Sequence, residues 1–207
     1  MPTDSNINLR TENLSCVRDD RILFEGLGFI VEPNQVLLLE GQNGSGKTSL
    51  LRILCGFREP DTGDVFWCGE PINRGSFYLD MAYVGHMDGI KKELTVMENL
   101  NLSLALGQTG KLTIPQALEK VKLSGYDDQL IQALSAGQKR RLSLARLLVT
   151  HNVLWILDEP FTSLDKQGIE LVESLMVEHC ADGGIIVMTS HHDVNFPSEN
   201  IKRIRLS

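Results

Sequence analysis

The most informative segment of this chain is the octapeptide GQNGSGKT at Gly41–Thr48. It follows an apolar run at Val36–Leu39 and precedes a segment at Ser49–Leu54 whose apolar residues suit a helix. A buried strand, a tight loop and a helix in this order form the context that the pattern G-x-x-x-x-G-K-S/T requires. The octapeptide therefore predicts a loop that binds the phosphates of a nucleoside triphosphate.

The residue types in this loop explain how it would hold phosphate. Glycine allows positive φ and lets backbone N–H groups come close to phosphate oxygens. A helix that begins near Gly46 would add the positive end of its dipole. Lys47 would reach the β- and γ-phosphates, and the Thr48 hydroxyl would be a ligand of Mg²⁺. The predicted nucleotide-binding residues are Gly41, Asn43, Gly44, Ser45, Gly46, Lys47, Thr48 and Ser49.

Apolar runs separated by turn residues predict an α/β fold around this loop. A chain of 207 residues can form one α/β domain of good size. From about residue 91 to 148, apolar residues recur at three- and four-residue spacing, which predicts helices. Strands are expected within residues 6–40 and at 65–68, 81–84, 153–157 and 185–188, with a turn at 61–64 and an amphipathic helix at about 166–180. This order of elements predicts a parallel-sheet core that carries an inserted helical block.

Composition and charge argue against several classes of protein. The formal net charge is -7 and no basic face is evident, so a dedicated nucleic-acid-binding protein is not expected. The segment Met1–Arg10 is polar, so we expect no signal peptide, and no apolar run approaches the ~20 residues that span a bilayer. The scattered cysteines show no C-x-x-C pattern and suit buried thiols in a reducing compartment. Any action at a membrane would then require other chains.

Two acidic residues, Asp158 and Glu159, follow the predicted strand that starts at Val153. A strand end beside the phosphate-binding loop would place Asp158 where it can hold Mg²⁺, usually through water. Glu159 would project toward the γ-phosphate and could orient and deprotonate an attacking water. Acids at a strand end can also simply cap the next segment, but their combination with the loop favours the catalytic interpretation.

The segment Leu134–Gln138, with the sequence LSAGQ, precedes an apolar helix and predicts a second anion site. The hydroxyl of Ser135, the backbone N–H of Gly137 and the helix N-terminus could together bind an anion. Alone, the segment could equally be a serine cap and a glycine turn. Its position shortly before Asp158 favours the anion site.

In this order the motifs resemble those of the ATP-binding subunits of ABC transporters, and the likeness covers nearly the whole chain. Gly41–Thr48 is similar to the Walker A motif of that family, and Val153–Asp158 is similar to its Walker B motif. Leu134–Gln138 resembles the signature motif, and Ser163–Asp165 resembles the D-loop, in which Asp165 is the acidic residue. The resemblance implies a single ABC-type P-loop NTPase domain at 1–207. Such a domain has N-terminal antiparallel β-strands and a helical subdomain at approximately 87–142.

The resemblance also implies how two such chains act together. Two ATP molecules would be enclosed in a head-to-tail homodimer, each between one Walker A loop and the signature of the opposite chain. Ser135, Gly137 and Gln138 would therefore act on ATP held by the partner. His191 falls where the family has its switch histidine; the neighbouring His192 is a competing candidate, but His191 directly follows the expected strand and its Thr189-Ser190 end.

Several shorter segments are similar to the ATPase subunit of cytochrome c maturation (haem exporter) systems. These segments are Gly85-His86, Gly89-Ile90-Lys91, Glu93-Leu94-Thr95, Glu98-Asn99-Leu100, Leu154–Thr162 and Gly183-Gly184. The likeness implies ATP-driven haem handling or export in c-type cytochrome biogenesis. It also implies integral membrane subunits as partners and a peripheral location at the cytoplasmic face of a bacterial-type inner membrane.

The sequence leaves other functions open. We expect no direct haem site, because no C-x-x-C-H is present, and no nucleic-acid partner. One alternative is the ATPase subunit of an ABC transporter with a different cargo. A more remote alternative is a non-transport ABC protein, and a binding module without turnover is disfavoured by the complete set of catalytic residues.

Two positions depart from the pattern of the family. Most members carry a glutamine that contacts Mg²⁺ and the attacking water where this chain has His86. We hypothesise that neutral His86 replaces this glutamine as a catalytic and metal-contacting residue, and that hydrolysis falls as the pH drops through about 6.5; His86 could also be a simple loop residue. The aromatic residue that stacks on adenine in many relatives is replaced by Arg18, which could stack on the base or remain solvated.

Overall fold

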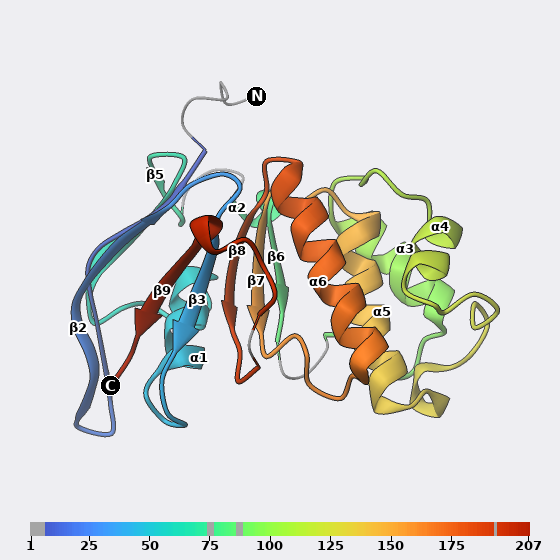
Figure 1. Cartoon of the computed structure of the whole chain (residues 1–207), viewed down its shortest axis with the longest axis horizontal. Helices are drawn as coiled ribbons and strands as arrows, with labels where there is room; N and C mark the ends of the chain where they lie inside the picture. Colours follow the sequence, from blue (N-terminus) through green and yellow to red (C-terminus); the bar gives the residue numbers. More distant parts are fainter. Residues whose placement is uncertain (1–6, 74–76, 86–88, 193) are drawn as a thin grey trace.

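The computed structural model describes residues 7–73, 77–85, 89–192 and 194–207. Within these residues the strands form an antiparallel sheet with the order β2-β1-β4-β5 and a parallel sheet with the order β6-β7-β8-β3-β9 (Figure 1). The antiparallel sheet consists of β1 (Leu9–Arg18), β2 (Arg21–Val31), β4 (Thr62–Trp67) and β5 (Glu70–Pro71). The parallel sheet consists of β3 (Val36–Glu40), β6 (Met81–Val84), β7 (Leu154–Asp158), β8 (Ile185–Thr189) and β9 (Ile201–Arg205).

The helices lie on both faces of the parallel sheet, which explains why its strands are almost continuously apolar. Helices α3 to α6 lie beyond one face, and α1 lies between the other face and the antiparallel sheet (Figure 1). The α-helices are α1 (Lys47–Leu54), α2 (Phe77–Asp80), α3 (Val96–Leu106), α4 (Ile114–Lys120), α5 (Ala136–Val149) and α6 (Lys166–Ala181). Short 3₁₀ turns, η2 (Ile131–Ala133) and η3 (Ser198–Asn200), precede α5 and β9. No helix formed by the described residues is both long enough and apolar enough to cross a bilayer.

Strand β7 separates two clusters of the apolar core. Successive side chains of a strand point to opposite faces. Leu154 and Ile156 accordingly lie in the cluster with α1 and the antiparallel sheet, whereas Trp155 and Leu157 lie in the cluster with α3 to α6. Burial on both faces holds the carboxyl end of β7 rigidly, and this end carries Asp158.

The fold class predicted from the sequence is confirmed, including the antiparallel N-terminal strands and the parallel core. The predicted turn at 61–64 is wrong in part, because β4 already begins at Thr62 and pairs with β1. A register shift in that pairing accommodates Gly63, whose φ is 85°. Strand β9 was not predicted from its mixed sequence, IKRIR. The helical subdomain expected at 87–142 remains a prediction; this range contains α3, α4 and the first half of α5.

Candidate nucleotide-binding site

The phosphate-binding loop joins β3 to α1 and ends at Gly46, the N-cap residue of α1. Gly46 has a φ of 99°, a left-handed conformation that residues with a Cβ atom avoid. A Cβ atom at this position would also lie 3.0 Å from the Cβ of Leu23 on β2. The positive φ and the close approach of β2 therefore both favour glycine at this position.

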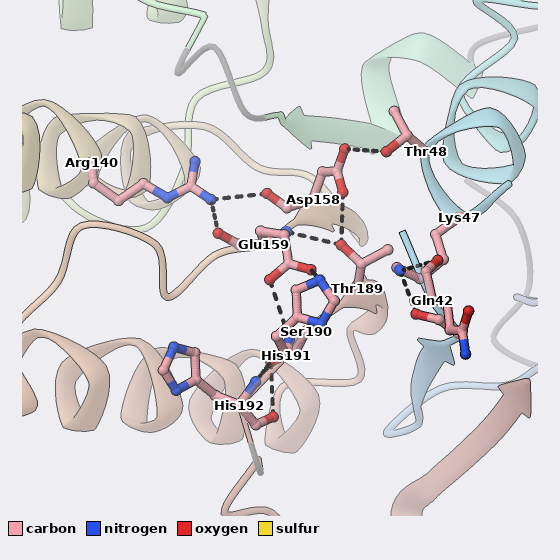
Figure 2. A network of polar contacts seen from close by, with 11 residues as sticks. Gln42, Lys47, Thr48, Arg140, Asp158, Glu159, Thr189, Ser190, His191 and His192 are labelled. Carbon is pink, nitrogen blue, oxygen red and sulfur yellow. Dashed lines mark hydrogen bonds and ion pairs between the residues drawn. The ribbon is translucent and has the colours of Figure 1, made fainter. Parts of the chain in front are cut away.

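Lys47 and Ser45 present polar groups inside the loop. The Lys47 ammonium donates to the carbonyl oxygens of Gly41 at 2.6 Å and Gln42 at 3.1 Å (Figure 2). The buried Ser45 hydroxyl has no hydrogen-bond partner among the described residues. A buried polar atom left unpaired is unfavourable unless a ligand or water completes it. The loop therefore fits an anionic ligand such as a phosphate chain.

The carboxylate of Asp158 connects β7, α1 and β8. It accepts hydrogen bonds from Thr48 Oγ1 at 3.1 Å and from Thr189 Oγ1 at 2.7 Å (Figure 2). Asp158 is only 6% exposed, and Thr189 is fully buried. Hydroxyl and carboxylate oxygens are the ligands that Mg²⁺ prefers. Thr48 and Asp158 therefore fit a magnesium ion, as the sequence predicts.

Glu159 follows β7 and faces His191. The backbone N–H of His191 donates to Glu159 Oε2 at 3.3 Å, and the ring Nε2 lies 3.4 Å from Oε1 (Figure 2). His192 instead turns toward the ring of Phe161, with a centroid distance of 6.1 Å. This geometry favours His191 over His192 as the histidine that acts with Glu159.

Two groups near Asp158, Tyr83 and Cys55, stay neutral. Burial raises the pKa of Tyr83 to about 12 and raises that of Cys55, and the Asp158 carboxylate raises both further. Neither group carries a charge near neutral pH.

One cavity of about 330 Å³ brings most of the predicted residues together. Its lining residues are Arg18, Leu23, Asn43, Gly44, Gly46, Lys47, Thr48, Ser49, Asp158, Glu159 and His191. Gly41 and Ser45 line an adjoining hollow that shares Asn43 and His191 with it. Arg18 lies at the exposed rim, where its guanidinium is 3.5 Å from the Asp19 carboxylate. His86, expected near this cavity, lies outside the described residues.

The predicted signature residues lie elsewhere. Ser135 caps α5 and forms a capping box with Gln138: Ser135 Oγ accepts from the Gln138 N–H at 3.2 Å, and the Ser135 N–H donates to Gln138 Oε1 at 2.8 Å. Gly137 and Asp165 line the same cavity as these residues, and that cavity shares no lining residue with the one around Lys47. Within one chain, the signature segment and the phosphate-binding loop are therefore separate.

Two residues of the site were not predicted from the sequence. One is Thr189, which donates a hydrogen bond to the buried Asp158 carboxylate, and the other is Arg140. Thr189 lies opposite Asp158 in the pairing of β7 with β8. The signal in the sequence was a polar residue at the end of the apolar strand Ile185–Thr189. Arg140 is 3% exposed, although it lies in the basic run Lys139–Arg141, which is typical of a solvated helix face.

Comparisons with known proteins show what this chain is similar to. The family model described as "ABC transporter" matches residues 24–162. The chain is 44% identical over 201 residues to the cytochrome c biogenesis ATP-binding export protein CcmA of Aliivibrio fischeri, covering 96% of this chain and 98% of that protein. It is 45% identical over 202 residues to the protein of the same name from Yersinia pestis, covering 96% and 93%.

Solved structures support the fold. An ABC transporter ATP-binding protein from Pyrococcus furiosus superposes with a TM-score of 0.82 at 23% identity, covering 96% of this chain and 97% of that one. An ATP-binding subunit of an ABC transporter superposes with a TM-score of 0.78 at 26% identity, covering 88% and 79%.

Proposed function

The chain belongs to the ABC transporter family and is an ATPase of that family, and from this premise we propose that it couples ATP binding and hydrolysis to haem handling or export in c-type cytochrome biogenesis. The observation that carries this proposal is the 44% identity to a cytochrome c biogenesis protein over 96% of the chain. The site supports turnover and not binding alone, because Lys47, Asp158 and Glu159 all line one cavity.

The geometry suggests a role for each charged group in hydrolysis. Lys47, whose ammonium is held by the carbonyls of Gly41 and Gln42, would bind the β- and γ-phosphates of ATP. Thr48 and Asp158 would hold Mg²⁺, which neutralises charge on the phosphates when bound. Glu159 would orient the attacking water and accept its proton, and His191 would hold the Glu159 carboxylate in position. His86 would contact the metal and the water in place of the usual glutamine, and Arg18 would stack on adenine.

The separation of the signature segment from the phosphate-binding loop supports a head-to-tail homodimer. Ser135, Gly137 and Gln138 present a helix N-terminus at an open cavity of about 520 Å³. In the dimer, this cavity would close over the γ-phosphate bound to the partner. Asp165, which caps α6 at the same cavity by accepting from the Gly168 N–H at 2.8 Å, would lie at the dimer interface.

A groove between β6 and α3 suggests where membrane subunits bind. Its lining includes the exposed apolar side chains Phe57, Tyr78, Leu102 and Leu106. Exposed apolar side chains that gather at one groove are typical of a protein interface. Gly89 and Lys91, which follow the segment that carries His86, line the same groove. We therefore place integral membrane subunits here, with the chain peripheral at the cytoplasmic face of a bacterial-type inner membrane.

The proposal is tested by Glu159→Gln in cells whose only copy of the gene carries the substitution. We expect the covalently bound haem of c-type cytochromes to be lost while the level of the variant protein equals that of wild type. Glu119→Gln, the same substitution at an exposed position on α4, is the matched control and should leave the haem signal unchanged. Normal haem content in the Glu159→Gln cells would reject the cytochrome c role and favour a transporter with another cargo.

A further inference from the structure

Arg140 lies in the first turns of α5, the helix that the predicted signature residue Ser135 caps. Its side chain is almost completely buried, with 3% exposure. A buried charge is costly unless hydrogen bonds compensate it. The hydrogen bonds of this guanidinium must therefore offset the cost of its burial.

The guanidinium binds backbone carbonyls at the ends of β7 and β6. Its Nη2 donates to the carbonyl oxygens of Asp158 at 3.0 Å and Glu159 at 2.5 Å (Figure 2). Its Nε donates to the Pro160 carbonyl at 3.1 Å, and its Nη1 donates to the Gly85 carbonyl at 2.9 Å. Guanidinium is a planar fork of donors that holds several acceptors in a fixed arrangement. Arg140 thus ties the signature helix to the ends of both β7 and β6.

The backbone of Glu159 needs such support. Its φ is 52°, in the left-handed region that is uncommon for residues other than glycine, asparagine and aspartate. Its N–H donates to Thr189 Oγ1 at 2.9 Å, and its carbonyl accepts from Arg140. Both backbone polar groups of Glu159 are therefore held, and this conformation directs the carboxylate toward His191.

We propose that Arg140 is a positioning residue for ATP hydrolysis, which holds Glu159 in its left-handed conformation and so fixes the direction of the catalytic carboxylate. The proposal rests on the proposed role of Glu159 in hydrolysis. It also makes the orientation of Glu159 depend on the position of α5. A displacement of the signature helix, as when Ser135 engages a nucleotide on the partner, would move the carbonyl of Glu159 through the same guanidinium.

The test is Arg140→Lys, which keeps the positive charge and removes the planar set of guanidinium donors. Misplacing a catalytic group by about 1 Å can lower the rate about 100-fold, so we expect kcat to fall between about 10- and 100-fold. The KM for ATP should change less than about twofold, because Arg140 does not line the cavity around Lys47. Arg10→Lys is the matched control: Arg10 lies on β1, where its guanidinium contacts Glu12 and stands over the Phe66 ring, and it lines none of the cavities described above, so its kcat should stay near wild type.

A double variant separates positioning from a general structural effect. If Arg140 acts through the Glu159 carboxylate, then Arg140→Lys should lower the residual rate of Glu159→Gln by less than about twofold. Losses that multiply in the double variant, or an unchanged kcat in Arg140→Lys, would overturn the proposal. If Arg140→Lys does not fold, Arg140→Gln, which removes the buried charge, takes its place in both measurements.

The same measurements distinguish failure of the inference from failure of the proposed function. Full turnover in Glu159→Gln alone would reject the catalytic role of Glu159 and the inference with it. Loss of turnover in Glu159→Gln together with wild-type kcat in Arg140→Lys would reject the inference alone.

Discussion

Substitution of Thr189 tests how its hydroxyl holds Asp158 and Glu159. The hydroxyl donates to Asp158 Oδ1 at 2.7 Å and accepts from the Glu159 N–H at 2.9 Å. Thr189→Val keeps the shape of the side chain and removes both interactions. Because Thr189 is 0% exposed, water cannot replace the lost hydroxyl without a local rearrangement.

The cost of this substitution follows from the two hydrogen bonds. A hydrogen bond to a charged carboxylate contributes about 1.5–3 kcal/mol, and a buried N–H left without an acceptor costs about 1 kcal/mol or more. We therefore expect the free energy of unfolding to fall by about 3 kcal/mol in Thr189→Val. Thr189→Ser keeps the hydroxyl and loses a buried methyl group, so it should lose only about 1 kcal/mol.

Urea denaturation of both variants and wild type at neutral pH measures these differences by linear extrapolation. A smaller kcat should accompany the loss in Thr189→Val, because the Glu159 N–H is released. A loss below about 1 kcal/mol in Thr189→Val, or one no larger than that of Thr189→Ser, would refute the argument.

Three further outcomes are expected. His86→Gln should remove the acid limb of the pH–rate profile near pH 6.5, and an unchanged limb would show that His86 does not titrate in the reaction. Burial lowers the pKa of His179 to about 4 from the ordinary 6.5. The unfolded chain therefore binds the additional proton between these values, and the free energy of unfolding should fall by about 3 kcal/mol as the pH drops from 7 to 4. His179→Phe should reduce this fall in the free energy of unfolding, measured by denaturation at several pH values. An equally steep fall in the variant would show that other groups cause it. Because Arg18 replaces an aromatic residue, ATP and GTP should bind with similar Kd, and a preference for ATP above about tenfold would contradict this.

Much of this fold could be predicted because its local signals agree with one another. The octapeptide at Gly41–Thr48, the apolar run before Asp158 and the LSAGQ segment each specify backbone geometry through residues close in sequence. The helix cap at Ser135 and the start of α1 after Gly46 follow directly from such local rules.

The features that were missed depend on partners far away in the chain. Strand β9 has a mixed sequence and forms because it pairs with the edge of β3, where Val36 lies opposite Ile201. Nothing local distinguishes Arg140 from its neighbour Arg141, and only the carbonyls at the end of β7, about 20 positions later, make its burial favourable. Long-range pairing of this kind leaves no periodic pattern in the sequence.

The place of β3 in the parallel sheet has a consequence for how the protein is made. Val36 pairs with Ile186 on one side and Ile201 on the other, so both neighbours of the strand before the phosphate-binding loop are synthesised long after that strand. Loops this long close at a large entropic cost, and such non-local pairing folds slowly. Nucleotide stabilises only a chain in which the binding site exists. ATP therefore cannot assist the early stages of biosynthesis, and the nascent chain must keep the apolar β3 segment from aggregating until β8 and β9 arrive.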